Sequence, residues 1–215
     1  MSNPRNPRDE LAEKLADRIL LDAIGSAASS GLLLTRPEDV EGALFISDNL
    51  QAALKGRGAF VLYASLDEAS SADSIISSVV CEAIQRLAGR CQSEEGPVAN
   101  GVGDAAAAFP EKKVGIGRDV SLCSAFVRLS ELAGRVIVLI IDNVQRAQDT
   151  AEGKATLYAL KAARDEINSS KHQGLRVVLV GADEGHLRML CCENDQAFFA
   201  TPMKNLPRQV ASAID

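Results

Sequence analysis

Four short segments in which almost every residue is aliphatic divide this chain, and they limit its fold more than any other feature. They are Leu32–Thr35, Ala59–Ser65, Val136–Asp142 and Leu175–Gly181. Strands that are apolar on every residue are typical of parallel sheets with both faces covered by helices. With right-handed crossovers, the sequence predicts an α/β three-layer sandwich around a doubly wound, mainly parallel sheet of about five strands.

Helical patterns fill most of the chain between these strands. We expect helices over Pro7–Ala28, Pro37–Lys55, a stretch starting at Asp73, Ser121–Ala133, Ala151–Ser169 and Glu184–Cys192, and a last extended segment at Phe198–Leu206. The stretch 93–119 is rich in Gly, Ala and acidic side chains, which predicts a long flexible loop between two helices, called here the 93–119 excursion. We expect one domain over residues 1–215, with residues 1–30 as an N-terminal helix.

Composition narrows the classes of partner. The net charge of −6 gives no general attraction to nucleic acid or anionic lipid. No apolar run approaches the roughly 20 residues of a membrane helix, and the N-terminus lacks the apolar segment of a secretory signal. The five cysteines are an odd number without a disulfide-like pattern, which favours reduced thiols in a cytoplasmic protein. We therefore expect no membrane partner and no nucleic-acid partner.

The order and spacing of the elements carry a resemblance that covers nearly the whole chain. Its strongest segments are Arg57–Leu66, Val136–Gln145, Leu157–Ser170, Leu175–Leu190 and Asp195–Pro202. This order resembles the AAA-type ATPases of the P-loop NTPase superfamily and, more narrowly, a group of bacterial ATP-binding proteins. The resemblance implies that Val136–Asp142 is the Walker B strand and that Asp142 stands where such enzymes hold magnesium.

The segment after the first strand departs from this family. An active member needs a Gly-Lys-Ser/Thr phosphate loop, in which backbone N–H groups and the lysine hold the phosphates. Alignment on Pro37 places Glu41, Gly42 and Ala43 at those three positions, and no lysine lies between Arg36 and Lys55. The resemblance therefore implies a degenerate Walker A motif.

The same turn is acidic. Glu38, Asp39 and Glu41 lie in the first turn of the predicted helix, and a carboxylate about 5 Å from a phosphate costs roughly 3 kcal/mol at an effective dielectric near 20. We expect the turn to repel a triphosphate. An ordinary acidic helix N-terminus is the favoured interpretation, and residual nucleotide binding through backbone N–H groups is the alternative.

The remaining positions that the resemblance assigns to ATP hydrolysis also differ. Asn143 replaces the Glu that follows the Walker B Asp, and an amide cannot accept a proton from water as a carboxylate can. A plain strand-to-helix turn at Asp142-Asn143 is the favoured interpretation. Asp183 and Glu184 stand where the family has its sensor residue. We expect no helical lid domain, since the chain ends at Asp215 soon after the last core segment.

A second candidate site comprises Cys191 and Cys192, with His186 nearby in the sequence. A metal site needs about four convergent ligands, and the only other histidine is His172. Reduced thiols on a short helix are favoured over a metal or redox centre.

The leading hypothesis is therefore a non-catalytic pseudo-ATPase that binds another protein or regulates it, without a cofactor. We expect a protein partner whose identity the sequence leaves open, with a related active ATPase as one candidate. The candidate contact surfaces are the helix that carries Leu11, Leu15 and Ile19 and the 93–119 excursion. One alternative is a nucleotide-binding switch or weak NTPase that binds ATP and magnesium through Arg36, Lys55 or Lys112. A second alternative is a nucleic-acid-associated accessory factor. The sequence leaves the oligomeric state open.

Overall fold

A single sheet organises the protein. The computed structural model describes residues 6–21, 31–37, 39–66, 70–94 and 121–207. Within them the sheet has five strands in the order β2-β3-β4-β1-β5, and every pair is parallel. The strands are β1 (Gly31–Thr35), β2 (Phe60–Ser65), β3 (Ile137–Asp142), β4 (Leu175–Gly181) and β5 (Met203–Asn205). This confirms the predicted parallel α/β sheet.

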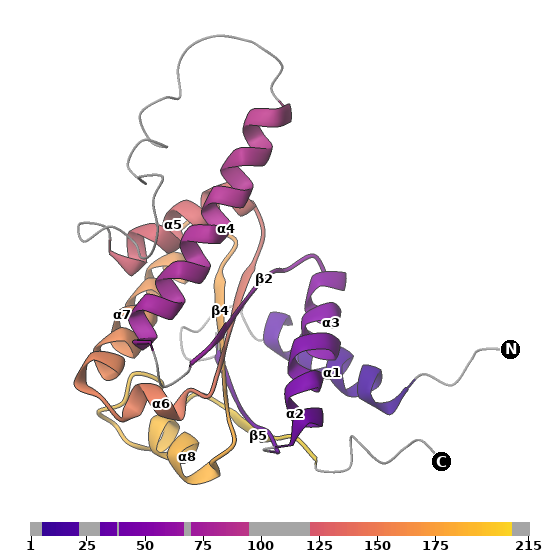
Figure 1. The fold of residues 1–215 in the computed structure, drawn as a ribbon, viewed down its shortest axis with the longest axis vertical. Helices are drawn as coiled ribbons and strands as arrows, with labels where there is room; N and C mark the ends of the chain where they lie inside the picture. Colours follow the sequence, from indigo (N-terminus) through magenta and orange to yellow (C-terminus); the bar gives the residue numbers. More distant parts are fainter. Residues whose placement is uncertain (1–5, 22–30, 38, 67–69, 95–120, 208–215) are drawn as a thin grey trace, which may run out of the picture.

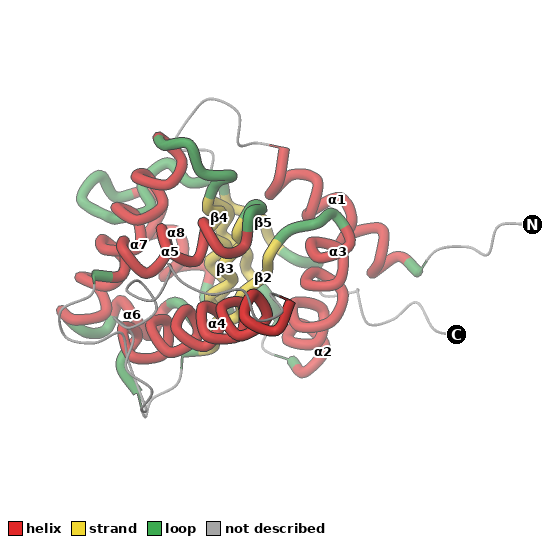
Figure 2. The backbone as a smooth tube through the Cα atoms, turned by 90° about the horizontal axis from the view of Figure 1, so that it is seen from above, coloured by secondary structure: helices red, strands yellow, loops and turns green. Residues whose placement is uncertain are grey.

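Helices cover both faces of the sheet (Figures 1 and 2). One face carries α4 (Ala72–Glu94), α5 (Leu122–Ala133), α6 (Gln145–Gln148), α7 (Ala151–Ser169) and α8 (Glu184–Cys192). The other carries α1 (Pro7–Leu21), α2 (Val40–Leu44), the π-helical turn η2 (Phe45–Leu50) and α3 (Gln51–Gly56). No described helix is long and apolar enough to cross a membrane.

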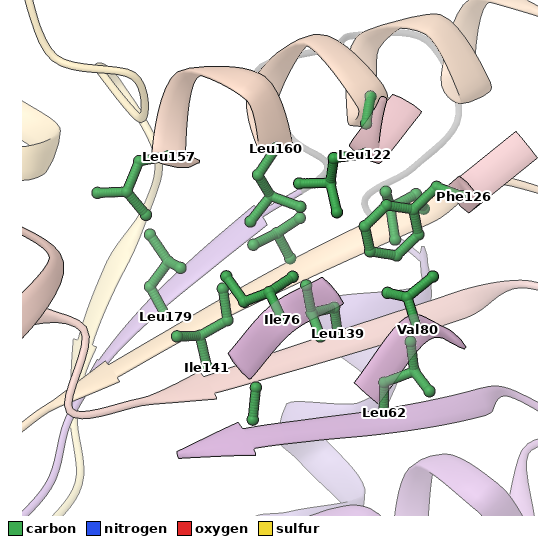
Figure 3. Close-up of a cluster of buried hydrophobic side chains, with 14 of the residues drawn as sticks. Leu62, Ile76, Val80, Leu122, Phe126, Leu139, Ile141, Leu157, Leu160 and Leu179 are labelled. Atoms are coloured by element: carbon green, nitrogen blue, oxygen red, sulfur yellow. The ribbon is translucent and has the colours of Figure 1, made fainter. Parts of the chain in front are cut away.

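The larger core lies between the sheet and α4, α5 and α7. Figure 3 shows the side chains from the helices reaching those of the strands. Alternation along the strands decides which side chains face this core: Leu139 and Ile141 of β3 point into it, whereas Val138 and Ile140 point into the opposite core. Because both sets are fully buried, β3 needs an apolar residue at nearly every position.

The smaller core includes the apolar side of α1, which corrects one of our expectations. Leu15 and Ile19 are only 2% and 5% exposed, and Leu11 packs against the same cluster. Arg57 ties this helix to the end of α3 by ion pairs with Glu13 and Asp17. Leu15 and Ile19 are therefore not available to a partner on this surface.

Three predicted boundaries differ from the structure. The helix after β1 begins at Val40 rather than at Pro37 and contains a π-helical turn. Only Met203–Asn205 of the expected 198–206 extension is a strand, since residues 197–200 form turns that end at Ala200 with a positive φ of 61°. Helix α4 continues to Glu94, past the expected start of the excursion. The rest of that excursion and residues 22–30 lie outside the described residues.

Candidate functional site

The carboxyl ends of the inner strands meet at one edge of the sheet. The register pairs Ser65 with Asp142 and Thr35 with Gly181. Arg36, directly after β1, therefore lies close to Asp142 at the end of β3, although 106 residues separate them. This edge is where doubly wound folds place their ligands.

Asp142 is buried, with 2% of its surface exposed, and its carboxylate is saturated with donors. Arg36 Nε donates to Oδ1 over 2.9 Å, and the backbone N–H of Asn143 donates to the same oxygen over 2.8 Å. The Tyr63 hydroxyl donates to Oδ2 over 2.9 Å. A buried carboxylate is tolerated when it is paired and hydrogen-bonded, and here the guanidinium supplies the counter-charge.

Tyr63 is the site residue that our sequence analysis did not include. Burial, followed by the negative charge of Asp142, raises the pKa of Tyr63 to about 12. The hydroxyl therefore remains a donor to the carboxylate well above neutral pH. The available signal was one hydroxyl-bearing aromatic side chain within an apolar strand, two positions before the strand ends at Ser65.

Arg36 is fixed by more than the carboxylate. Its NH1 donates to the Pro37 carbonyl over 3.1 Å and its NH2 to Asn143 Oδ1 over 3.1 Å. Its backbone N–H donates to the Gly181 carbonyl of β4 over 2.9 Å. Because its side chain is only 10% exposed, this guanidinium is positioned for Asp142 rather than for an incoming phosphate.

Asn143 forms the strand-to-helix turn that we expected at this position. Its φ is +56°, a left-handed conformation that asparagine tolerates better than most residues. Its Oδ1 accepts from Arg36, and its Nδ2 lies 3.4 Å from both the Ser65 hydroxyl and the Leu66 carbonyl. Both ends of the amide thus hold the local structure.

The turn at the start of α2 is closed by its own hydrogen bond and is tightly packed at Gly42. The Asp39 carboxylate accepts the Gly42 backbone N–H over 2.7 Å, which caps the helix and explains why it begins at Val40. A Cβ at position 42 would lie 2.7 Å from the Pro37 carbonyl oxygen. A lysine at this position would therefore force the turn to move.

The other residues that we expected near a phosphate also lie in helical or distant positions. Glu41 lies within α2, and Ala43 is half-buried with its N–H 3.5 Å from the Asp39 carbonyl. Lys55 lies 15 residues after Val40, roughly 22 Å along the helical axis, and its Nζ donates to Gln51 Oε1 over 3.1 Å. It is too far away to bind a phosphate at α2, which corrects that expectation. Lys112 lies outside the described residues.

The β4–α8 turn provides carboxylates that cap a helix. Asp183 Oδ1 accepts the backbone N–H of His186 over 3.1 Å, and its Oδ2 lies 3.0 Å from His186 Nδ1. The hydrogen bonds from His186 lower the pKa of Asp183. Glu184 is paired with Arg188 over 2.7 Å. Asp183 thus stands at the end of β4, where the resemblance placed it, as the N-cap of α8.

A polar cavity opens between the β1–α2 and β4–α8 turns. Its volume is about 570 Å³, and Arg36, Asp39, Glu184 and Asn205 contribute to its walls. The Thr35 hydroxyl donates to Asn205 Oδ1 over 3.0 Å, so part of the wall is already hydrogen-bonded. The cavity has the size of a small-molecule site, with two carboxylates where a nucleotide would need donors.

The residues present do not fit the magnesium ion that the resemblance implies. Mg²⁺ requires oxygen ligands at about 2.0–2.1 Å in octahedral geometry. Both Asp142 oxygens instead accept hydrogen bonds, and the Arg36 guanidinium stands 2.9 Å from one of them. No group of three or more His, Cys, Asp or Glu side chains among the described residues is arranged to hold a metal ion.

Comparisons with known proteins support the fold alone. No protein-family model and no curated protein matches the chain. Two structures from Aeropyrum pernix match 96% of it at 12% sequence identity and a TM-score of 0.50. They are the ORC1 protein in complex with DNA and the ORC2 protein in ADPNP-ADP complexes. The chain therefore shares with these two proteins the fold of a five-stranded parallel sheet surrounded by helices. The matched region is 46% and 48% of those two chains, so this chain spans about half their length.

Proposed function

We propose that this protein is a non-catalytic pseudo-ATPase, an AAA-type fold that serves as a protein–protein interaction or regulatory module. The observation that carries the proposal is the buried ion pair between Arg36 and Asp142, with 2.9 Å between Nε and Oδ1. The carboxylate that an ATPase would use for magnesium has an internal cation instead.

Electrostatics explain why this pair and a bound magnesium ion exclude each other. Two unit charges 4 Å apart interact by about 4 kcal/mol at an effective dielectric near 20, so a divalent ion at that distance from a guanidinium is repelled by about 8 kcal/mol. Magnesium would have to displace Arg36 from Asp142, Asn143 and the Pro37 carbonyl at once. Such a displacement would break these contacts of the Arg36 guanidinium, and no other protein group would replace them.

The phosphate side of the site supports the same conclusion. The Gly42 N–H, which would face a phosphate, already bonds the Asp39 carboxylate, and position 42 lacks space for a side chain. Phosphoryl transfer depends on positioned cations around the transferred group. Around this turn the nearest guanidinium neutralises Asp142, and Asp39 and Glu184 add negative charge to the cavity wall.

The sheet and its two buried cores give the module a rigid frame, and we propose another protein as its partner, with a related active ATPase as the leading candidate. Affinity purification from the native cell followed by mass spectrometry tests this proposal. We expect enrichment of an active ATPase that remains bound during washing at moderate salt. A free monomer that captures no protein above a matched tag control would contradict the interaction role.

A phosphate-release assay with ATP and magnesium tests the non-catalytic half independently. We expect turnover at the background of a buffer control, with no difference between the wild type and Asp142→Asn. Turnover that is lost in Asp142→Asn would instead support a weak NTPase. The ORC2 neighbour, solved in ADPNP-ADP complexes, motivates that alternative, but Arg36 and Lys55 are both engaged elsewhere.

The ORC1 neighbour, solved in complex with DNA, motivates a nucleic-acid-associated role as the second alternative. The net charge of −6 and the 4% aromatic content weigh against it. Fluorescence anisotropy with labelled single- and double-stranded DNA at low ionic strength separates the two. Binding that weakens steeply as salt increases would favour this alternative over the pseudo-ATPase role.

A further inference from the structure

The adjacent cysteines at the end of α8 lie in contact. Cys191 Sγ and Cys192 Sγ are 3.7 Å apart. Neighbouring helical residues point in directions about 100° apart, since a turn contains 3.6 residues, so both thiols turn toward each other here. Cys192 is exposed to solvent and Cys191 is partly buried. One thiol is therefore open to a soluble oxidant, with a second thiol beside it.

We propose that Cys191 and Cys192 form a redox-modified dithiol, which a two-electron oxidant such as hydrogen peroxide converts to a disulfide between neighbouring residues. The exposed Cys192 thiolate attacks the peroxide O–O bond, which gives a sulfenic acid and releases one water after protonation. The Cys191 sulfur then attacks that sulfenic sulfur and releases a second water. Two thiols and one peroxide thus become one disulfide and two waters.

The two cysteines have different roles in this sequence. Burial, followed by the hydrogen bond and charge of Cys192, raises the pKa of Cys191, and its Sγ lies 3.5 Å from the Arg188 carbonyl. Cys191 is therefore the poorer initial nucleophile and the natural resolving thiol. Because resolution needs its thiolate, closure of the disulfide should accelerate as pH rises.

Closing the ring requires a local change of backbone. Neighbouring Cα atoms are about 3.8 Å apart across a trans peptide, whereas disulfides usually join Cα atoms at least about 4.4 Å apart. The trans peptide fixes this Cα distance, so the bond closes a strained ring. The φ and ψ angles of the last turn of α8 must change to bring the sulfurs from 3.7 Å to a bond length of about 2.05 Å. That turn includes the Glu193 N–H bond to the Met189 carbonyl, and the Cys191 carbonyl accepts the Ala200 N–H over 2.9 Å.

The segment that follows would respond to this change. Residues 193–200 are held to α8 by the Ala200 bond and to α7 by the hydrogen bond from the Tyr158 hydroxyl to the Asp195 carbonyl. Met189 and Phe199, both about half exposed at 48% and 47%, lie on the helix end and on this segment. Oxidation would thus alter an apolar part of the surface. The described residues offer these thiols no third metal ligand, which favours redox chemistry over metal binding.

Peptide mapping after mild oxidation tests the proposal on the full-length protein. Trypsin releases residues 189–204 as one peptide with both thiols and no other cysteine. After limited peroxide treatment and alkylation, we expect this peptide to be unalkylated and about 2 Da lighter than its reduced form. A dithiol reductant should reverse the change. Hydrogen exchange over 189–200 should accelerate in the oxidised protein.

Cysteine-to-serine variants test which thiols form the disulfide. Cys192→Ser should abolish the lighter peptide, whereas Cys81→Ser combined with Cys123→Ser should retain it. Cys191→Ser should leave a sulfenic acid at Cys192 that a dimedone-type reagent traps. Over-oxidation of Cys192 in the wild type without the lighter product, or a covalent dimer through Cys192, would overturn the proposal.

Discussion

Replacing Arg36 by methionine should destabilise the protein substantially, because it leaves the Asp142 carboxylate buried without a counter-charge. The two side chains are 10% and 3% exposed, and 2.9 Å separates the paired atoms. Breaking one partner of such a pair costs about 3–5 kcal/mol. The remaining bonds from Tyr63 and the Asn143 N–H soften the loss, so we expect about 3 kcal/mol. This is a large share of a typical stability of about 5–15 kcal/mol.

Urea unfolding followed by far-ultraviolet circular dichroism suits this test, since the chain has no tryptophan. The matched control is Arg188→Met, which breaks an ion pair to Glu184 whose side chains are 63% and 41% exposed. Exposed pairs contribute about 0–1 kcal/mol, so this variant should change little. A similar small loss in Arg36→Met would refute the reasoning.

A double-mutant cycle isolates the interaction between the two charges. Asp142→Asn keeps an oxygen for Tyr63 and removes the carboxylate charge. Combined with Arg36→Met, it should cost less than the sum of the two single changes, with a coupling energy of about 0.5–3 kcal/mol. Additive losses would mean that Arg36 and Asp142 do not act as a pair in solution.

Three further predictions test the surroundings of the site. Gly42→Ala should destabilise the protein by about 1–3 kcal/mol through overpacking, because the new Cβ would lie 2.7 Å from a carbonyl oxygen. Gly89→Ala is the control: its Cβ would meet nothing within 4 Å, so this variant should be more stable by up to about 1 kcal/mol. Urea unfolding of both variants measures the two changes. In Tyr158→Phe, where Tyr63 is the only tyrosine, tyrosinate absorbance should titrate near pH 12 rather than 10.0. Because the folded-state pKa is raised, the stability that this group contributes is complete below pH 10.0 and is lost as pH rises through about 12, and Tyr63→Phe should remove that loss. Leu15→Ala should cost about 2–5 kcal/mol in urea unfolding if this side chain belongs to the core, whereas a partner-facing residue would change binding with little change in stability.

Much of the sheet was predictable because a strand that is buried on both faces needs apolar residues at nearly every position. Every residue of β3 and β4 is buried, so each strand appears as a nearly continuous aliphatic run, a pattern that helices do not require. Only Arg176 interrupts the run in β4, and Asp142 ends the run in β3. The short strand β5 has one partly buried and two exposed residues. It carries no such mark, and its boundaries were accordingly predicted poorly.

The apolar stripe of α1 shows a limit of pattern alone. Leu11, Leu15 and Ile19 recur at helical spacing, which establishes that the helix has an apolar side. The same spacing serves a helix that packs on its own core and one that binds a partner. Only the three-dimensional arrangement, with this side against η2 and α3, distinguishes the two.

The central pair of the site was equally beyond a local pattern. Arg36 and Asp142 are 106 residues apart, and they meet because β1 and β3 flank β4 and end at the same edge. The resemblance to AAA-type ATPases implied that the phosphate-loop lysine and the catalytic Glu of that family are replaced. Neither the resemblance nor the sequence pattern indicated that Arg36 and Tyr63 both donate hydrogen bonds to Asp142.

Calorimetric titration of the wild-type protein with ATP and magnesium tests the central claim most directly. If the Arg36–Asp142 pair and the capped α2 turn close the site, no saturable heat should appear at nucleotide concentrations up to about 1 mM. Any binding would then have a free energy weaker than about −4 kcal/mol. Micromolar binding that requires magnesium and disappears in Asp142→Asn would contradict the account.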